Sequence, residues 1–283
     1  MVFLLIQSNC KKRASAAIPV TDSQQDEPQL PESPLPNVNA PPRPQPTPAA
    51  RLVAAPPVKL ALPRVAIIID DLGQADTALV SRLGSLDIPL TVAVLPFLSN
   101  SEKNARTANS MGAEVILHMP MEPIGYPGPG KNPGEGAILY SQPEIEVRNN
   151  IARAMENIPY AKGFNNHMGS RITPERDRMG WILEEAKKRG WYFLDSRTEK
   201  DTVAMEVARE IGIPALERKV FLDDDPSQEE MTRQWERAIK IAKQDGLVVI
   251  IGHIHPETVA FLEKVLPNAK KDAQFVKASV LAK

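Results

Sequence analysis

The sequence predicts an α/β fold in which parallel strands form a closed or nearly closed barrel with helices outside it. Short apolar runs alternate with longer helical stretches some seven times across about 200 residues, which is typical of a parallel sheet. Polar residues, including all four histidines, follow the apolar runs. Because ligand sites in such folds lie where the strands end, the pattern predicts both a scaffold and the edge that carries its chemistry.

The predicted elements follow one another in a regular order from residue 64 onward. The first strand, residues 65–69, is a continuous run of Val, Ala and Ile, as expected for a strand buried on both faces. Further strands are predicted at 90–95, 114–117, 163–164, 191–194, 215–216 and 247–251. Helices are predicted between them at 75–86, 101–111, 144–157, 175–189, 202–211 and 228–244. We expect one folded domain over residues 64–270, followed by a C-terminal tail at 271–283.

The first 63 residues differ in composition from the rest and hold 13 of the 27 prolines. Since proline lacks a backbone donor and fixes φ, we expect residues 21–63 to be a disordered, extended linker. Residues 1–20 begin with a short apolar run, which is interpreted as a truncated signal or anchor segment. The expected location is the cell envelope, in the periplasm, with a membrane tether through the N-terminus. The alternative is a disordered cytoplasmic N-terminus.

The overall charge and the cysteine content exclude two classes of protein. Lys and Arg number 34 and Asp and Glu number 35, so the formal net charge is -1, which argues against a nucleic-acid partner. The single cysteine, Cys10, permits neither a disulfide framework nor a cysteine-based zinc site. Any metal site must therefore use histidines and carboxylates.

Candidate functional residues follow five of the predicted strands. In order along the chain they are Asp70, Asp71, His118, Glu122, Asn166, His167, Asp195, His253 and His255. Taken singly, an Asp can cap a helix and an Asn can form a turn, and the acidic run 223–225 is interpreted as a helix cap or a solvent-facing stretch. Their joint occurrence at one edge favours a site.

The chemistry of this set points to metal-assisted hydrolysis. An Asp–His–His set with open positions suits a divalent metal, with zinc the expected ion. Such a metal lowers the pKa of water, and a nearby carboxylate can take its proton. A histidine that titrates near neutrality can protonate a leaving amine. Residues of these types predict hydrolysis of an amide or an ester.

Six short segments resemble the divergent polysaccharide deacetylase family over residues 64 to about 266. They are IIIDDLG (67–73), TVAVLP (91–96), HMPMEP (118–123), GFNNHMGS (163–170), FLDS (193–196) and GH (252–253). The resemblance implies a distorted (β/α)7 barrel of the NodB deacetylase type. It implies a metal-dependent hydrolase of non-peptide carbon–nitrogen bonds that removes acetyl groups from an envelope glycan. Carried over by position, Asp70 is the base, Asp71 binds the metal and His253 is the acid.

The metal motif departs from the usual family pattern of two histidines four residues apart. Here that spacing gives His118 and Glu122, so His167 is the candidate third ligand beside Asp71, with Glu122 as the alternative. Glu122, Asn166 and His255 are expected to contact substrate, His255 because residues i and i+2 of a strand share a face.

Asp195 is expected to orient a catalytic imidazole. The altered motif keeps two other functions open. One is a catalytically weak glycan-binding envelope protein on the same barrel, and the other is hydrolysis of a non-sugar amide or ester.

Overall fold

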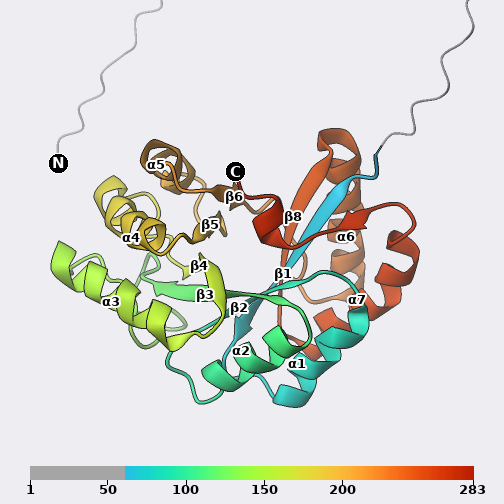
Figure 1. The fold of residues 1–283 in the computed structure, drawn as a ribbon, viewed down its shortest axis with the longest axis horizontal. Helices are drawn as coiled ribbons and strands as arrows, with labels where there is room; N and C mark the ends of the chain where they lie inside the picture. Colours follow the sequence, from blue (N-terminus) through green and yellow to red (C-terminus); the bar gives the residue numbers. More distant parts are fainter. Residues whose placement is uncertain (1–60) are drawn as a thin grey trace, which may run out of the picture. The chain divides into compact units, whose positions relative to one another are not determined.

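A computed structural model describes residues 61–283, which form a curled parallel sheet with helices on its outer side (Figure 1). The expectations for residues 1–20 and for the linker up to residue 60 lie outside the described residues. Among residues 61–283, no helix combines the length and the apolar character required to cross a membrane.

The sheet has nine strands, and all the strand pairs are parallel. Its order is β6-β5-β4-β3-β2-β1-β8-β7, with β9 paired to β1. The edge strands β6 and β7 are consecutive in sequence, so the sheet curls into a distorted half-barrel, which confirms the predicted fold class. The strands are β1 (Arg64–Leu72), β2 (Thr91–Val94), β3 (Glu114–Met121), β4 (Ala161–Met168), β5 (Tyr192–Asp195), β6 (Ala215–Glu217), β7 (Val220–Phe221), β8 (Leu247–His253) and β9 (Gln274–Phe275).

Seven α-helices connect and cover these strands. They are α1 (Thr77–Leu83), α2 (Ser101–Ser110), α3 (Glu144–Asn157), α4 (Arg176–Lys188), α5 (Ala204–Ile211), α6 (Gln228–Asp245) and α7 (Pro256–Ala269). Asp76 and Ser227 cap α1 and α6 through their side chains, since each accepts from a backbone N–H in the first turn. Every predicted strand and helix is present. The sequence pattern does not predict α7, β7 or β9.

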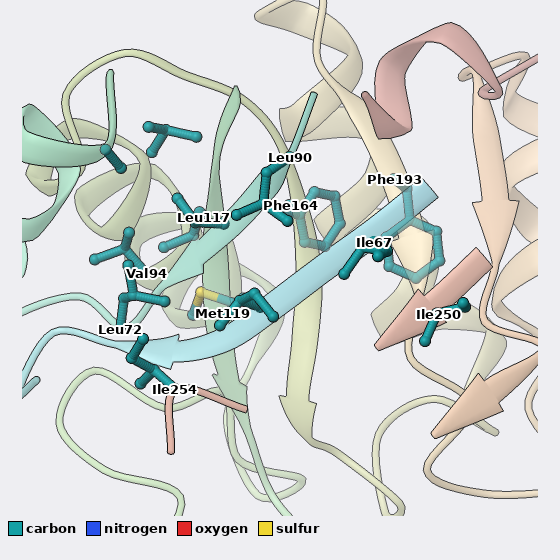
Figure 2. Close-up of a cluster of buried hydrophobic side chains, with 14 of the residues drawn as sticks. Ile67, Leu72, Leu90, Val94, Leu117, Met119, Phe164, Phe193, Ile250 and Ile254 are labelled. Atoms are coloured by element: carbon teal, nitrogen blue, oxygen red, sulfur yellow. The ribbon is translucent and has the colours of Figure 1, made fainter. Parts of the chain in front are cut away.

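The strands separate two apolar layers because successive side chains point to opposite faces. Along β1, Val65, Ile67 and Ile69 face the helices and belong to the larger cluster. Figure 2 shows part of this cluster, in which Ile67 lies with residues of β3, β4 and β5 such as Leu117, Phe164 and Phe193. The alternate residues Ala66 and Ile68 face the barrel interior and belong to the second, smaller cluster.

The last residues of the chain fill this interior instead of forming a separate tail. β9 pairs with β1, and Ala278 and Leu281 are buried in the inner cluster. The backbone amide of Ala215 on β6 donates to the carbonyl of Lys283 at 3.0 Å. The expectation of a tail at 271–283 is therefore corrected. Small inner residues such as Ala66 leave room that these C-terminal side chains occupy, which local sequence patterns do not reveal.

Candidate metal centre

Strand alternation places three candidate residues at the mouth of the barrel. Asp70, His118 and His253 each lie two residues beyond an inner-cluster isoleucine (68, 116 and 251), on the same face. Asp70 and His253 are register partners on the neighbouring strands β1 and β8. The inner face is therefore apolar in the middle of the sheet and polar at its carboxyl edge.

A distortion of β1 brings Asp71 to the same place. In a regular strand, Asp70 and Asp71 would point to opposite faces. The register between β1 and β2 shifts between Ile69 and Leu72, and Asp71 has φ 64, in the left-handed region. This backbone conformation costs about 1 kcal/mol or more of free energy in a residue other than glycine, and such residues are concentrated at functional sites. The bulge lets two adjacent carboxylates share one site.

Asp71, His118 and His167 bring three ligand atoms together. Oδ1 of Asp71 lies 3.1 Å from Nε2 of His118 and 3.1 Å from Nδ1 of His167. The two histidine nitrogens are themselves 3.1 Å apart. Zinc bonds of 2.0–2.1 Å in a tetrahedral site would place donor atoms about 3.3 Å apart. The three side chains form a candidate metal site of the right size for a divalent ion.

The electrostatics of this cluster also fit a cation. Oδ1 of Asp71 is buried and accepts no hydrogen bond within the part of the chain that the structure describes. Such an orphaned acceptor is costly unless a cation or a donor satisfies it. Burial alone would raise the pKa of Asp71, but the adjacent imidazoles hold it well below its usual range. The carboxylate is therefore ionised and able to bind a metal.

Asp70 lies beside the ligand set and is 2% exposed. Its Oδ2 is 3.7 Å from Nε2 of His118, and both its oxygens accept from Nδ2 of Asn165 at 3.0 Å. Burial raises the pKa of Asp70, while the charges of His118 and His253 oppose that increase. Asn165 was not singled out from the sequence, where it was treated as turn chemistry. The available signal was its spacing, because it shares a strand face with His167.

His253 is held by Asp223, which connects β7 to α6. Nδ1 of His253 is 2.9 Å from Oδ1 of Asp223, and Oδ2 of Asp223 accepts from the His253 amide at 2.7 Å and from the Thr258 hydroxyl at 2.6 Å. Burial opposes protonation of His253, but Asp223 outweighs it and raises the pKa of His253 to about 9. Burial would raise the pKa of Asp223, and the His253 contacts lower it. The interpretation of Asp223 as a cap or solvent-facing residue is corrected.

Asp195 does not orient a catalytic imidazole, the role that the sequence predicted for it. Asp195 accepts from the Arg197 amide at 2.8 Å and from the Thr202 hydroxyl at 3.0 Å, so its oxygens hold a loop. The carboxylate that orients an imidazole is Asp223. Burial raises the pKa of Asp195, and the Arg197 and Thr202 contacts oppose the rise.

Asn166 points to the face opposite Asn165, and its amide is used within the protein. It accepts from the Ser196 amide at 2.9 Å and donates to the Met168 carbonyl at 2.8 Å. The hydrogen bond from the Ser196 amide connects β4 to the segment after β5. Asn166 is 1% exposed, so the structure does not place it where it could contact a substrate.

Glu122 and His255 lie at the margin of the site. Oε2 of Glu122 accepts from the Tyr140 amide at 2.7 Å, so this carboxylate anchors the loop between β3 and α3. His255 is exposed at the N-cap of α7, with its ring centroid 5.8 Å from that of His253. β8 ends at His253, so the strand alternation that predicted a shared face stops before His255.

A parallel half-barrel with an Asp–His–His set at its carboxyl edge defines a polysaccharide deacetylase-like fold with a candidate metal site. The chain belongs to the divergent polysaccharide deacetylase family, whose model matches residues 67–282. This confirms the family indicated by the sequence segments.

Proteins similar to this chain include two relatives and one solved structure. The protein YibQ of Escherichia coli (strain K12) is 37% identical over 221 residues, which cover 77% of this chain and 67% of YibQ. A Haemophilus influenzae (strain ATCC 51907 / DSM 11121 / KW20 / Rd) protein is 31% identical over 216 residues, covering 75% of this chain and 74% of its own. The crystal structure of ATU2773 from Agrobacterium tumefaciens C58 is 25% identical with a TM-score of 0.71, covering 80% and 92% of the two chains.

Proposed function

We propose that the protein is a metal-dependent hydrolase of non-peptide carbon–nitrogen bonds that removes acetyl groups from an envelope polysaccharide or glycan. One observation carries this proposal. The donor set of Asp71, His118 and His167 lies beside a buried carboxylate, Asp70, whose register partner on β8 is His253, an imidazole held by its own carboxylate, Asp223. The family supports a polysaccharide as the substrate.

Asp71, His118 and His167 are the residues that would hold the metal. Two imidazole nitrogens and one carboxylate oxygen favour zinc among the common divalent ions. When bound, the ion supplies Lewis acidity, which polarises a carbonyl and lowers the pKa of water.

Asp70 is the proposed general base. Its Oδ2 lies 3.7 Å from Nε2 of His118, so it is next to the donor set, and it is not among the three grouped ligand atoms. Burial raises the pKa of Asp70, which makes it a stronger proton acceptor than an exposed aspartate. Asp70 would take the proton of the attacking water.

His253 is the proposed general acid. Asp223 binds Nδ1 of His253, so Nε2 is the ring atom left to give a proton to the departing amine. With a pKa raised to about 9, the imidazole is protonated at neutral pH, as an acid must be. Asp70 and His253 are neighbours across the β1–β8 pair, so the base and the acid can act on the same amide group of the substrate.

We also propose that the protein works in the periplasm and is tethered to the membrane through its N-terminus. This rests on the proline-rich composition of residues 21–63 and on the apolar start of the chain. The net charge of -1 supports a glycan and not a nucleic acid as partner. Fractionation of cells that express the full chain would test the location, and its recovery in the cytosol would contradict it.

Release of acetate from acetylated oligosaccharides by the zinc-loaded full chain tests the activity. Asp70→Asn and His253→Ala should each retain zinc and lose about 10²–10⁴-fold in turnover, the range for one acid–base group. His255→Ala is the comparison for the acid. If His255→Ala loses turnover and His253→Ala does not, the acid is His255. If the wild type binds acetylated glycans but hydrolyses none with any divalent metal, the glycan-binding alternative replaces the hydrolase.

A further inference from the structure

We propose that Asn165 is a positioning residue whose single side-chain amide selects the coordinating nitrogen of His118 and aligns the Asp70 carboxylate. The part concerning His118 stands on geometry alone, and the part concerning Asp70 rests on the proposed function. The residue is fully buried at the carboxyl end of β4, in register with His118 on β3.

The orientation of the Asn165 amide is fixed by its neighbours. Its Nδ2 lies 3.0 Å from each oxygen of Asp70 and 3.1 Å from the Ser196 hydroxyl. A carboxyl group carries a hydrogen on at most one of its oxygens, so the amide group that lies equally close to both Asp70 oxygens must be the NH2. The reversed amide would place its oxygen against the Asp70 oxygens. The carbonyl Oδ1 therefore faces His118.

This orientation determines which nitrogen of His118 carries the hydrogen. Oδ1 of Asn165 lies 2.7 Å from Nδ1 of His118 and can only accept, so Nδ1 is the protonated nitrogen. In the neutral ring, the lone pair then belongs to Nε2. Nε2 is the atom that lies 3.1 Å from both Asp71 Oδ1 and His167 Nδ1. The amide thus presents the His118 lone pair to the candidate metal site.

The same amide reaches the base across the barrel mouth. Asn165 lies on β4 and Asp70 on β1, which β3 and β2 separate within the sheet. They meet only because the sheet curls, and the contact spans 95 positions of sequence. Since both Asp70 oxygens share one donor group, the carboxylate plane is aligned by the residue that orients His118. One side chain therefore links ligand geometry to base geometry.

Two substitutions separate these roles. Asn165→Asp keeps an oxygen acceptor for Nδ1–H of His118 but replaces the amide donor to Asp70 with a second carboxyl group, which must share a proton with Asp70. Asn165→Leu, of similar size, removes both. Ser196→Ala is the matched control, because it removes only the third contact of the Asn165 amide. Near-ultraviolet circular dichroism and thermal unfolding identify the variants that fold.

Affinity for zinc, measured by competition with a chromophoric chelator, is the first readout. Asn165→Leu should bind zinc about 10–100-fold more weakly, the usual effect of losing the partner of a metal-binding histidine. Asn165→Asp and Ser196→Ala should retain the wild-type affinity. Turnover of Asn165→Asp should nevertheless fall by about 10²-fold or more, because Asp70 has lost its donor. Wild-type zinc affinity in Asn165→Leu, or equal losses in the Leu and Asp variants, would overturn the proposal.

The tautomer of His118 can be read without any variant. Nitrogen-15 NMR of the metal-free wild type, recorded at alkaline pH where the imidazoles are neutral, should show His118 protonated at Nδ1. Protonation at Nε2 would overturn the proposal even if no Asn165 variant folds. Neither affinity nor tautomer depends on turnover, so an inactive wild type would contradict the hydrolase proposal and leave the assignment for His118 intact.

Discussion

The two ends of the barrel each bury a carboxylate oxygen on the inner side, and the surroundings of these two oxygens are opposite in kind. At the amino end, Oε1 of Glu114 accepts from the Thr91 hydroxyl at 3.1 Å, the Tyr192 hydroxyl at 2.8 Å and the Ser279 amide at 3.1 Å. At the carboxyl end, Oδ1 of Asp71 is surrounded by two imidazole nitrogens and is an orphaned acceptor within residues 61–283.

This difference separates a structural carboxylate from a functional one. β3 contributes to both ends, with Glu114 at its start and His118 near its end. Neutral donors fully occupy the Glu114 oxygen and connect the C-terminal residues to the barrel, so the amino end is closed. The carboxyl end gathers groups that can bind one cation together. A buried carboxylate does not by itself mark a site, whereas a buried carboxylate oxygen without a hydrogen-bond donor does.

The largest expected effect is the loss of metal at the carboxyl end. Asp71→Ala and His167→Ala should each abolish stoichiometric zinc binding, with affinity falling by more than about 10²-fold, because a ligand matters more than its outer partners. Metal analysis of the purified protein measures this. Glu122→Ala is the control, since the Glu122 carboxylate is held by the Tyr140 amide. Zinc that persists in His167→Ala and vanishes in Glu122→Ala would make Glu122 the third ligand.

The next effect concerns stability at the amino end. Glu114→Ala should lower the free energy of unfolding by about 3 kcal/mol, because three buried donors lose their acceptor. Zinc affinity should not change. Urea unfolding with and without zinc measures both quantities. Glu102→Ala is the control: it breaks an exposed ion pair with Arg106 and should leave the free energy of unfolding nearly unchanged. A Glu114→Ala protein that folds but no longer binds zinc would show that the two ends are coupled.

The smallest effect is the pH dependence of the His253–Asp223 pair. The folded pKa of His253, about 9, lies above the unfolded value near 6.5, so the stabilisation is complete below about pH 6.5. It should be lost as the pH rises through about 9. The difference between the two pKa values corresponds to about 3 kcal/mol, and solvent screening of the 25% exposed His253 side chain reduces this to on the order of 2 kcal/mol. Urea unfolding of the metal-free protein across this pH range measures it. Asp223→Asn should remove the pH dependence, and an unchanged dependence would assign it to another group.

The order of the elements and the edge that holds the chemistry are predictable from local patterns in the sequence. All seven predicted strands and six predicted helices are present, because apolar periodicity is a local property of the chain. The gathering of Asp71, His118 and His167 also followed from local reasoning, since parallel strands end at a common edge.

The choice of polar groups that meet at this edge depends on long-range packing. The sequence favoured Asn166 over Asn165 and Asp195 over Asp223, and it separated residues 271–283 from the barrel that they fill. Each of these outcomes depends on inter-strand register, on the bulge at Asp71 and on the curl that brings β4 opposite β1. Contacts across 95 positions of sequence, such as Asn165 with Asp70, are formed by the packing of the whole sheet, and no local pattern encodes them.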